Sequence, residues 1–366
     1  MYKGDPDVDD PYEDTVEKKF LAMDFISDRD LISTNGSRYP EGSQPHRVPF
    51  RFIIPDHQIP PHRERESASA AFLQLPPSLR GGSEFVDNSN SKVYMQPLVQ
   101  YTLHANLIAH RYSSHSVLPF KLDSTVEIQI CPRSGCQPPT AVDDFPGEFQ
   151  LTSVRRIRQH PLWGRTLGGM TITTTEPPPV VIGTSNATAQ ATSQCKITLI
   201  FKPRNPTKAA IPPLGLLRGI IRAQLHIKTY YSTQTFQQVP QRPPLRTQTR
   251  TLPSSAFRLR SEFLELGTYR VQITHWEFAS PSAASNSTSP GTSCKFGAEW
   301  ASSICLPIHT PAGIVPTFAS SFAVRSYCLR LNIVLNGLSH KPFELESPLQ
   351  IIYENREGCS AGFSLP

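Results

Sequence analysis

The sequence contains few of the features that mark an enzyme or a membrane-spanning chain. It has no GxSxG or HExxH motif, no glycine-rich phosphate loop and no paired CxxC. The absence of these motifs argues against the common classes of hydrolase, zinc peptidase and nucleotide-binding protein. We therefore expect no catalytic residue, no metal site and no cofactor. No apolar run approaches the length of a membrane span, and the acidic, polar start does not resemble a signal peptide.

Charge and glycine are also scarce. Charged residues make up 18% of the chain, and the 20 glycines are outnumbered by 36 prolines. Because proline interrupts helices, this excess disfavours long helices and favours short strands with stiff connections. The formal net charge of +6 permits an anionic partner, but no block of like charges predicts a nucleic-acid-binding arm, and we expect no nucleic acid partner.

The seven cysteines form no repeated CxxC pair, and we interpret them as reduced thiols of an intracellular protein. Cys131 and Cys136 have the wrong spacing for a zinc knuckle. Asp56, His57 and His62 are the other conceivable ligands, and we interpret them as a solvated turn after a strand.

Alternation of apolar and polar residues is abundant. The clearest case is residues 219–232, where Ile221, Ala223, Leu225 and Ile227 point one way and the polar side chains the other. Similar runs occupy residues 92–107, 124–130, 195–202, 268–276, 326–335 and 343–353. No 3.6-residue period persists for three turns. These patterns predict an all-β fold of sandwiches whose sheets have one face in the core and one in water.

Breaks in this alternation predict the domain boundaries. The stretch RVPFRFIIPDHQIPP, residues 47–61, is an apolar strand interrupted by prolines, which is typical of a sheet edge. Residues 131–149 and the stretches 175–194 and 279–293 have no alternation, and we interpret the last two as mobile surface loops. The expected organisation is a disordered acidic tail (1–19), a partial first sandwich (20–130), a linker (131–150), a second sandwich (151–356) and a tail (357–366).

One segment, LTSVRRIRQHPLWGRTL (residues 151–167), concentrates basic residues. It contains Arg155, Arg156, Arg158 and Arg165, and guanidinium groups bind phosphate and carboxylate bidentately. These arginines are the candidate contact for anionic lipid or a phosphorylated peptide. The alternative interpretation is that these arginines only form the solvated face of the first strand of the second domain. Strand alternation places Arg156 and Arg158 on one face and Arg155 on the other.

Four segments together resemble the fungal arrestin-like proteins, the α-arrestin branch of the arrestin superfamily. They are VPFRFIIPDHQIPP with LQLPPSL and VYMQPLVQYTLHANL, then LTSVRRIRQHPLWGRTLGGMTI, GLLRGIIRAQLHIKTYYST and VPTFASSFAVRSYCLRLNI. The resemblance implies two immunoglobulin-like β-sandwiches of the arrestin fold. Since members of that family carry further strands before the VPF segment, it also implies that the first sandwich is incomplete.

The resemblance implies a non-enzymatic adaptor that links cytoplasmic tails of plasma-membrane transporters or receptors to a HECT-type ubiquitin ligase for endocytosis and trafficking. Such an adaptor is cytoplasmic and peripheral at the plasma membrane or endosomes, where basic residues contact an anionic membrane surface. The chain lacks the PPxY motif by which relatives recruit the ligase. This leaves open a non-adaptor trafficking or structural sandwich of the retromer type, or a degenerate member without ligase recruitment.

Overall fold

The computed structural model is built of β-strands. It describes residues 54, 75–80, 85–87, 92–94, 97–112, 117–132, 148–158, 166–183, 192–204, 217–232, 235–236, 240, 258–279, 299–338 and 341–353. No helix occurs among these residues. The prediction of an all-β chain is therefore confirmed, in keeping with the excess of proline.

The first of two five-stranded antiparallel sheets has the order β10-β9-β14-β13, and β15 also pairs with β14. Its strands are β9 (Leu217–Tyr231), β10 (Arg258–Ile273), β13 (Phe318–Ala319), β14 (Ala323–Leu335) and β15 (Phe343–Leu349). The alternating segment around Ile221 is thus the centre of this sheet, and β10 lies at its edge.

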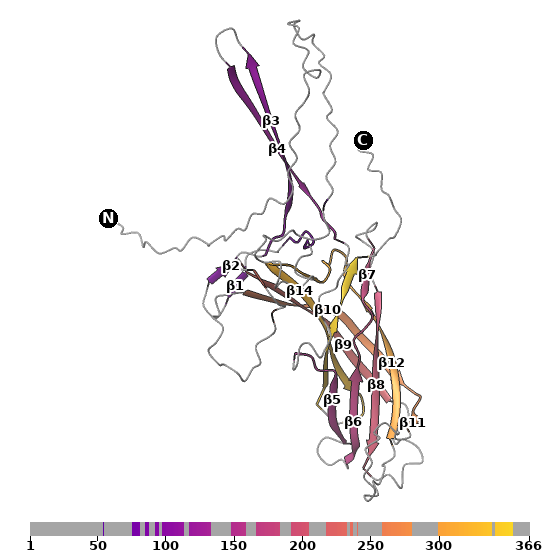
Figure 1. Cartoon of the computed structure of the whole chain (residues 1–366). Coiled ribbons are helices and arrows are strands. Elements are labelled where there is room, and N and C mark those ends of the chain that lie inside the picture. The colour runs from indigo at the N-terminus through magenta and orange to yellow at the C-terminus, as the bar shows by residue number, and fades with distance from the viewer. Residues whose placement is uncertain are drawn as a thin grey trace, which may run out of the picture.

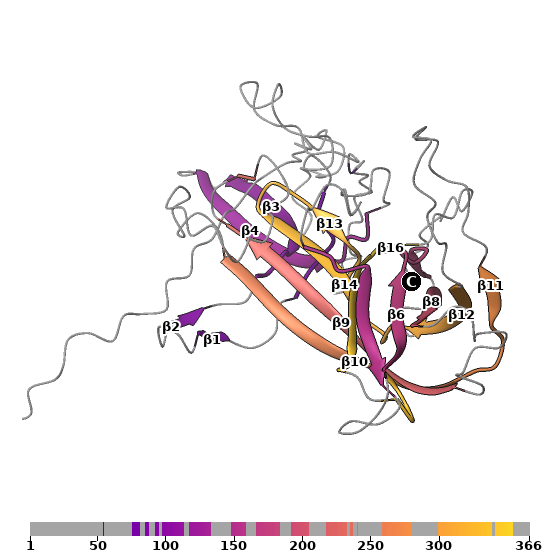
Figure 2. The ribbon, with the colours of Figure 1, turned by 90° about the horizontal axis from the view of Figure 1, so that it is seen from below.

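The second sheet has the order β11-β12-β8-β6-β5. Its strands are β5 (Thr152–Arg158), β6 (Thr166–Thr174), β8 (Thr192–Pro203), β11 (Glu277–Ala279) and β12 (Glu299–His309). Figure 2 shows the two sheets as separate layers, with β9, β10 and β14 in one and β6, β8 and β12 in the other. All ten strands lie within the range 151–356 predicted for the second sandwich.

The inner faces of the two sheets share one hydrophobic core. Ile221, Leu225 and Leu331 of the first sheet meet Ile172 and Leu199 of the second, and all five side chains are fully buried. Burying a side chain of this size is worth roughly 1.5–3 kcal/mol. The apolar residues whose period-2 spacing predicts these strands therefore also provide the main stabilisation of the sandwich.

One glycine fixes the spacing between β6 and β8. A Cβ atom at Gly168 would lie 2.2 Å from the backbone oxygen of Lys202, whereas one at Gly169 would meet nothing within 4 Å. Gly168 also faces Ile157 of β5, where the register between β5 and β6 shifts. The lack of a side chain at this position lets three strands approach closely at the edge that carries the predicted arginines.

A short parallel pair closes one end of the sandwich. It joins β7 (Val180–Ile182) to β16 (Ile351–Tyr353), and Val180 and Ile351 are fully buried. The prediction that the whole of residues 175–194 forms a mobile loop is therefore wrong for β7. The apolar triplet Val-Val-Ile inside this proline-rich stretch is long enough to pair and to reach the core.

The segments before residue 131 form hairpins. They are β1 (Phe85–Asp87) with β2 (Lys92–Tyr94), and β3 (Tyr101–Tyr112) with β4 (Val117–Ile128). In Figure 1 the β3–β4 hairpin extends away from the sandwich. Among the residues described here these hairpins do not pack as two facing sheets, so the partial first sandwich stays a prediction.

Two joints attach these N-terminal segments and the predicted linker to the sandwich. Leu79 bridges Val99 and packs on Phe318 and Ala323. Gln150, at the end of the predicted linker, exchanges two backbone hydrogen bonds with Glu346 of β15. The predicted tails, 1–19 and 357–366, and most of the linker lie outside the described residues, as do the strand residues Phe50 and Phe52.

Candidate functional site

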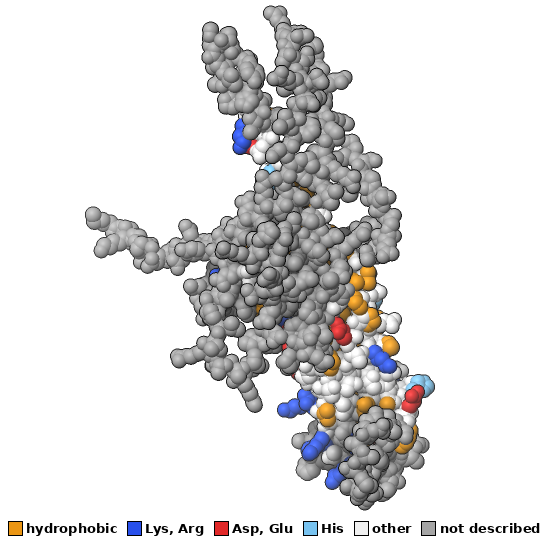
Figure 3. Space-filling model, in the orientation of Figure 1, with side chains coloured by type: hydrophobic (Ala, Val, Ile, Leu, Met, Phe, Trp, Pro, Cys, Tyr) orange, Lys and Arg blue, Asp and Glu red, His pale blue; other side chains and the backbone are white. Residues whose placement is uncertain are grey.

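The predicted arginines lie on β5, the edge strand of the second sheet. Arg156 and Arg158 are exposed on one face, while Arg155 is half-buried on the other. Figure 3 shows basic side chains along the edge where Figure 1 draws β5. Arg165 lies outside the described residues, so the structure brings together three of the four candidates.

These arginines lack acidic partners within the described part of the chain. Arg155 donates from Nη1 to the backbone oxygen of Val154 at 3.2 Å, and its Nε is enclosed without a described acceptor. No ion pair among the described residues involves Arg155, Arg156 or Arg158. Their proposed role as an anion contact stays a prediction.

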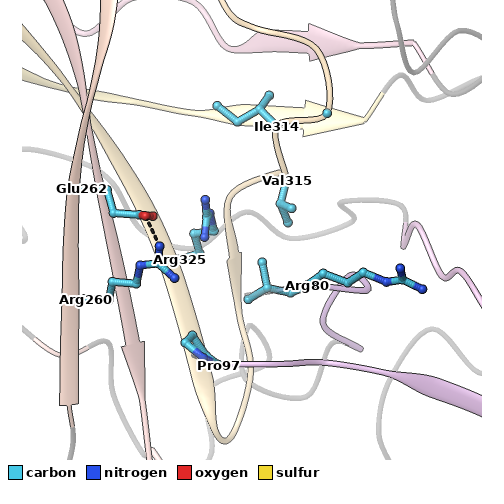
Figure 4. Close-up of a pocket in the computed structure, with 9 residues that line it drawn as sticks. Arg80, Pro97, Arg260, Glu262, Ile314, Val315 and Arg325 are labelled. Carbon is cyan, nitrogen blue, oxygen red and sulfur yellow. Dashed lines mark hydrogen bonds and ion pairs between the residues drawn. The ribbon is translucent and has the colours of Figure 1, made fainter. Parts of the chain in front are cut away.

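A second group of arginines lines a pocket at the joint between the N-terminal segments and the sandwich. The pocket has a volume of about 220 Å³ and is lined by Leu79, Arg80, Pro97, Arg260, Glu262, Gly313, Ile314, Val315 and Arg325. Figure 4 shows Arg260, Glu262 and Arg325 together on the side of the first sheet, with Pro97 and Arg80 entering from the N-terminal segments.

Strand register explains why Arg260 and Arg325 meet here. Both are directly opposite Thr229 of β9, one from β10 and the other from β14. The inner face of β9 belongs to the main core as far as Ile227, and Thr229 is the next inward residue but lies outside that core. The same face that is hydrophobic inside the sandwich therefore becomes polar where it leaves the sandwich.

Arg325 is the notable cation of this pocket because its described hydrogen-bond partners are neutral. Its Nε donates to the Tyr327 hydroxyl at 2.7 Å, and its Nη1 donates to the Thr229 hydroxyl at 3.1 Å. The other two arginines have carboxylate partners: Arg260 pairs with Glu262, and Arg80 with Glu127 at 2.8 Å. A guanidinium has five N–H donors, so Arg325 retains donors for a ligand.

The remaining lining residues are held by local structure. Gly313 has a φ of 75°, which allows the chain to turn before Ile314 and Val315. The Tyr327 hydroxyl donates to the backbone oxygen of Val315 while it accepts from Arg325. Burial raises the pKa of Tyr327 to about 12, and the Arg325 charge only partly opposes this shift. The phenol therefore remains a neutral link between Arg325 and the turn.

The opposite face of the same sheet carries a buried polar cluster, which we define as Glu148, His226, Lys228, Cys328 and Glu346. Lys228 is 2% exposed and pairs with Glu148. The ammonium of Lys228 also lies 5.6 Å from the ring centroid of Phe149, the residue after Glu148. His226 Nδ1 lies 3.0 Å from Glu346 Oε1. Residues 148–150 therefore cover part of a sheet face that the sequence pattern assigns to water.

Burial and neighbouring groups together set the protonation of this cluster. Burial raises the pKa of the Cys328 thiol to about 12, which keeps the thiol protonated at neutral pH. Burial alone would also raise the pKa of Glu346, but the hydrogen bond with His226 and the Lys228 charge outweigh it and lower that pKa. Burial would lower the pKa of Lys228, yet its interactions with Cys328 and Glu148 outweigh it and raise that pKa.

The hydrogen bonds of His226 have an order known from acyl-transfer enzymes. Its Nε2 lies 2.7 Å from Ser261 Oγ, and its Nδ1 contacts Glu346, giving a serine, histidine and carboxylate in series. Ser261, however, sits within an unbroken ladder from Arg258 to Glu265 of β10. A regular strand lacks the sharp turn that presents oxyanion donors beside a nucleophile. We interpret this series as support for the histidine ring.

Neither group of residues can be recognised in the sequence, for two different reasons. His226 and Lys228 occupy the polar positions of the clearest alternating strand, where the pattern predicts exposure. Arg80, Arg260 and Arg325 are isolated in the sequence and form no basic run. One sequence signal does point to the pocket: Arg325 is an arginine at an inward position of an alternating strand, two residues before Tyr327.

No family model matches the sequence, and no curated protein matches it significantly. In the part of the chain that the structure describes, no helix is both long and apolar enough to cross a membrane.

Proposed function

We propose that the protein is an arrestin-like adaptor that binds an anionic segment of a membrane protein's cytoplasmic tail in the Arg325 pocket. The single observation that carries this proposal is the half-buried Arg325 guanidinium, which lines a pocket and donates only to neutral hydroxyls among the described residues. Hydrogen bonds from arginine to phosphate or carboxylate are shorter and stronger than such neutral ones, so an acidic group is the ligand best suited to it.

The charge of the lining supports the same class of ligand. Three arginines and one glutamate line the pocket, and Glu127 pairs with Arg80 from outside the lining, which leaves an excess of one positive charge. Pro97 is on an N-terminal segment and Arg325 is on the sandwich, so a bound anion would lie where both parts of the chain meet. A tail that carries phosphate or several carboxylates would therefore also strengthen the joint between them.

The resemblance to α-arrestins supplies the rest of the proposal. In it, the bound tail belongs to a plasma-membrane transporter or receptor, and the adaptor recruits a HECT-type ubiquitin ligase that promotes endocytosis. Arg156 and Arg158 on the β5 edge would add a peripheral contact with an anionic membrane surface. The protein would then act in the cytoplasm, at the plasma membrane or endosomes, without catalysing a reaction.

Fluorescence anisotropy tests the pocket. Labelled tail peptides with and without a phosphoserine are titrated with wild type, with Arg325→Gln and with Arg222→Gln, which removes an exposed arginine from the other face of β9. We expect phosphorylated peptide to bind wild type more tightly and Arg325→Gln to weaken that binding by about tenfold or more, because a charged hydrogen bond is lost. Equal effects of the two variants would contradict the proposal.

Affinity purification tests the adaptor role. The tagged chain from cells should bring down a HECT-type ligase together with ubiquitinated membrane cargo. If cargo copurifies but no ligase does, the result favours the alternative function. The protein would then be a trafficking or structural sandwich of the retromer type, or a degenerate family member without ligase recruitment.

A further inference from the structure

Three side chains with metal-ligating atoms converge within the buried polar cluster. The ligand atoms of His226, Cys328 and Glu346 all lie within 4.8 Å of one another. Each comes from a different strand of the first sheet: β9, β14 and β15. His226 and Cys328 are buried at 8% and 1% exposure, so the arrangement is internal.

The sheet itself holds the three ligands in place. Cys328 is directly opposite His226 in the β9–β14 ladder. Glu346 is opposite Arg330, two residues further along the same face of β14, so it approaches Cys328 diagonally. Paired strands are stiffer than loops, and a site built on them does not need to be assembled by chain movement.

The contacts of His226 are those of a histidine that binds a metal through Nδ1. Its other nitrogen, Nε2, lies 2.7 Å from Ser261 Oγ, and its ring stacks on Phe263 with the centroids 4.3 Å apart. Metal-bound histidines almost always donate their second ring N–H to an oxygen partner, which fixes the tautomer and orientation. Ser261 provides that partner here.

The charges around the cluster do not by themselves select a cation. The carboxylates of Glu148 and Glu346 face the ammonium of Lys228, and Arg330, directly opposite Glu346 on β14, adds a second positive charge. Lys228 also lies within hydrogen-bonding reach of the Cys328 sulfur, and its positive charge competes with a metal. Binding would replace the thiol proton of Cys328 by the metal and release that proton to solvent.

We propose that His226, Cys328 and Glu346 bind a Zn²⁺ ion. Nitrogen, sulfur and oxygen from one residue each form a mixed ligand set that suits zinc, with one tetrahedral position left for a fourth ligand. The ion would join β9, β14 and β15 beneath residues 148–150. This site goes beyond the adaptor function proposed above and does not depend on it.

Cobalt(II) substitution tests the site directly. The full chain, stripped with a chelator, is titrated with Co²⁺ in wild type and in a variant whose other six cysteines are alanine. We expect one Co²⁺ per chain, a thiolate-to-cobalt charge-transfer band in both proteins, and loss of the band when Zn²⁺ is added. The band should disappear in Cys328→Ser and weaken at least tenfold in apparent affinity in His226→Gln and Glu346→Gln.

Matched substitutions control for residue type. Cys305→Ser, His309→Gln and Glu344→Gln change exposed residues of the same three types in β12 and β15, and they should leave the titration unchanged. Lys228→Gln removes the competing charge and should tighten metal binding by about tenfold or more. If the six-alanine variant does not fold, mass spectrometry of alkylated wild type should show that Zn²⁺ protects Cys328.

The proposal is overturned if wild type develops no thiolate band at one equivalent of Co²⁺. It is likewise overturned if the band survives Cys328→Ser, or if Zn²⁺ protects a different cysteine from alkylation.

Discussion

Arg260 of β10 and Arg325 of β14 lie in one row across the first sheet, on either side of Thr229 of β9. Two strand spacings separate their backbones by about 10 Å. Arg260 is neutralised by Glu262, whereas Arg325 is hydrogen-bonded to the hydroxyls of Thr229 and Tyr327. One of the two like charges is thus compensated within the sheet, and the other is directed at a pocket.

The buried pair of Lys228 and Glu148 should be important for stability. Lys228→Met leaves the Glu148 carboxylate, which is 9% exposed, without its cation, and we expect a loss of about 3–5 kcal/mol in the free energy of unfolding. Lys202→Met, which breaks an exposed pair with Glu299, should cost no more than about 1 kcal/mol. Urea denaturation followed by tryptophan fluorescence measures both, and similar losses for the two variants would refute the special role of the buried pair.

Tyr327 should make the protein lose stability at alkaline pH. Its pKa rises from 10.0 to about 12 on folding, so between these values the unfolded state loses a proton that the folded state keeps. Stability must then fall as pH increases, by up to about 1.4 kcal/mol per pH unit for this group. Unfolding free energies at pH 9, 10 and 11 should decline less steeply in Tyr327→Phe, and parallel declines would show that Tyr327 does not contribute.

Gly168 and Gly169 provide a matched pair on β6. Gly168→Ala places a Cβ against the Lys202 backbone oxygen, so the strands must separate, and we expect a cost of about 1–3 kcal/mol. Gly169→Ala meets nothing within 4 Å and should be neutral or slightly stabilising. Thermal unfolding of the two variants decides the matter, and the account of close strand approach fails if Gly169→Ala is the more damaging change.

Thiol reactivity should separate two cysteines of the sandwich. Cys328 is buried and its pKa is raised to about 12, so almost no thiolate is present or accessible at pH 8. Cys305 is exposed on β12. Iodoacetamide labelling read by mass spectrometry should modify Cys305 quickly and Cys328 only after denaturation. Rapid labelling of native Cys328 would show that residues 148–150 do not cover the cluster.

The sequence was sufficient to predict the strands and their core-facing residues. In β9 the alternation of Ile221, Ala223, Leu225 and Ile227 matches the buried face because a period of two leaves only two ways to orient a strand. It was insufficient for β10, which begins at Arg258 although only residues from Thr268 onward showed the expected pattern. An edge strand exposes both faces in part, so its sequence is less regular.

Neither of the two polar sites could be predicted, because each depends on contacts between distant segments. Lys228 contacts Glu148, which lies 80 positions away, and His226 contacts Glu346, which lies 120 positions away. Arg325 acquires its surroundings from Arg80 and Pro97, which lie in another part of the chain. Local alternation gives the face on which a side chain lies but does not reveal what covers that face.

Photo-crosslinking offers the most direct test of the central claim, that the Arg325 pocket receives an anionic tail. A phosphorylated tail peptide with a photoreactive residue beside the phosphoserine is irradiated with wild type, and the labelled residues are identified by mass spectrometry. The account predicts labelling of Pro97, Ile314 or Val315, suppressed by excess unlabelled phosphopeptide and by Arg325→Gln. Labelling confined to the β5 edge, or unchanged by Arg325→Gln, would contradict it.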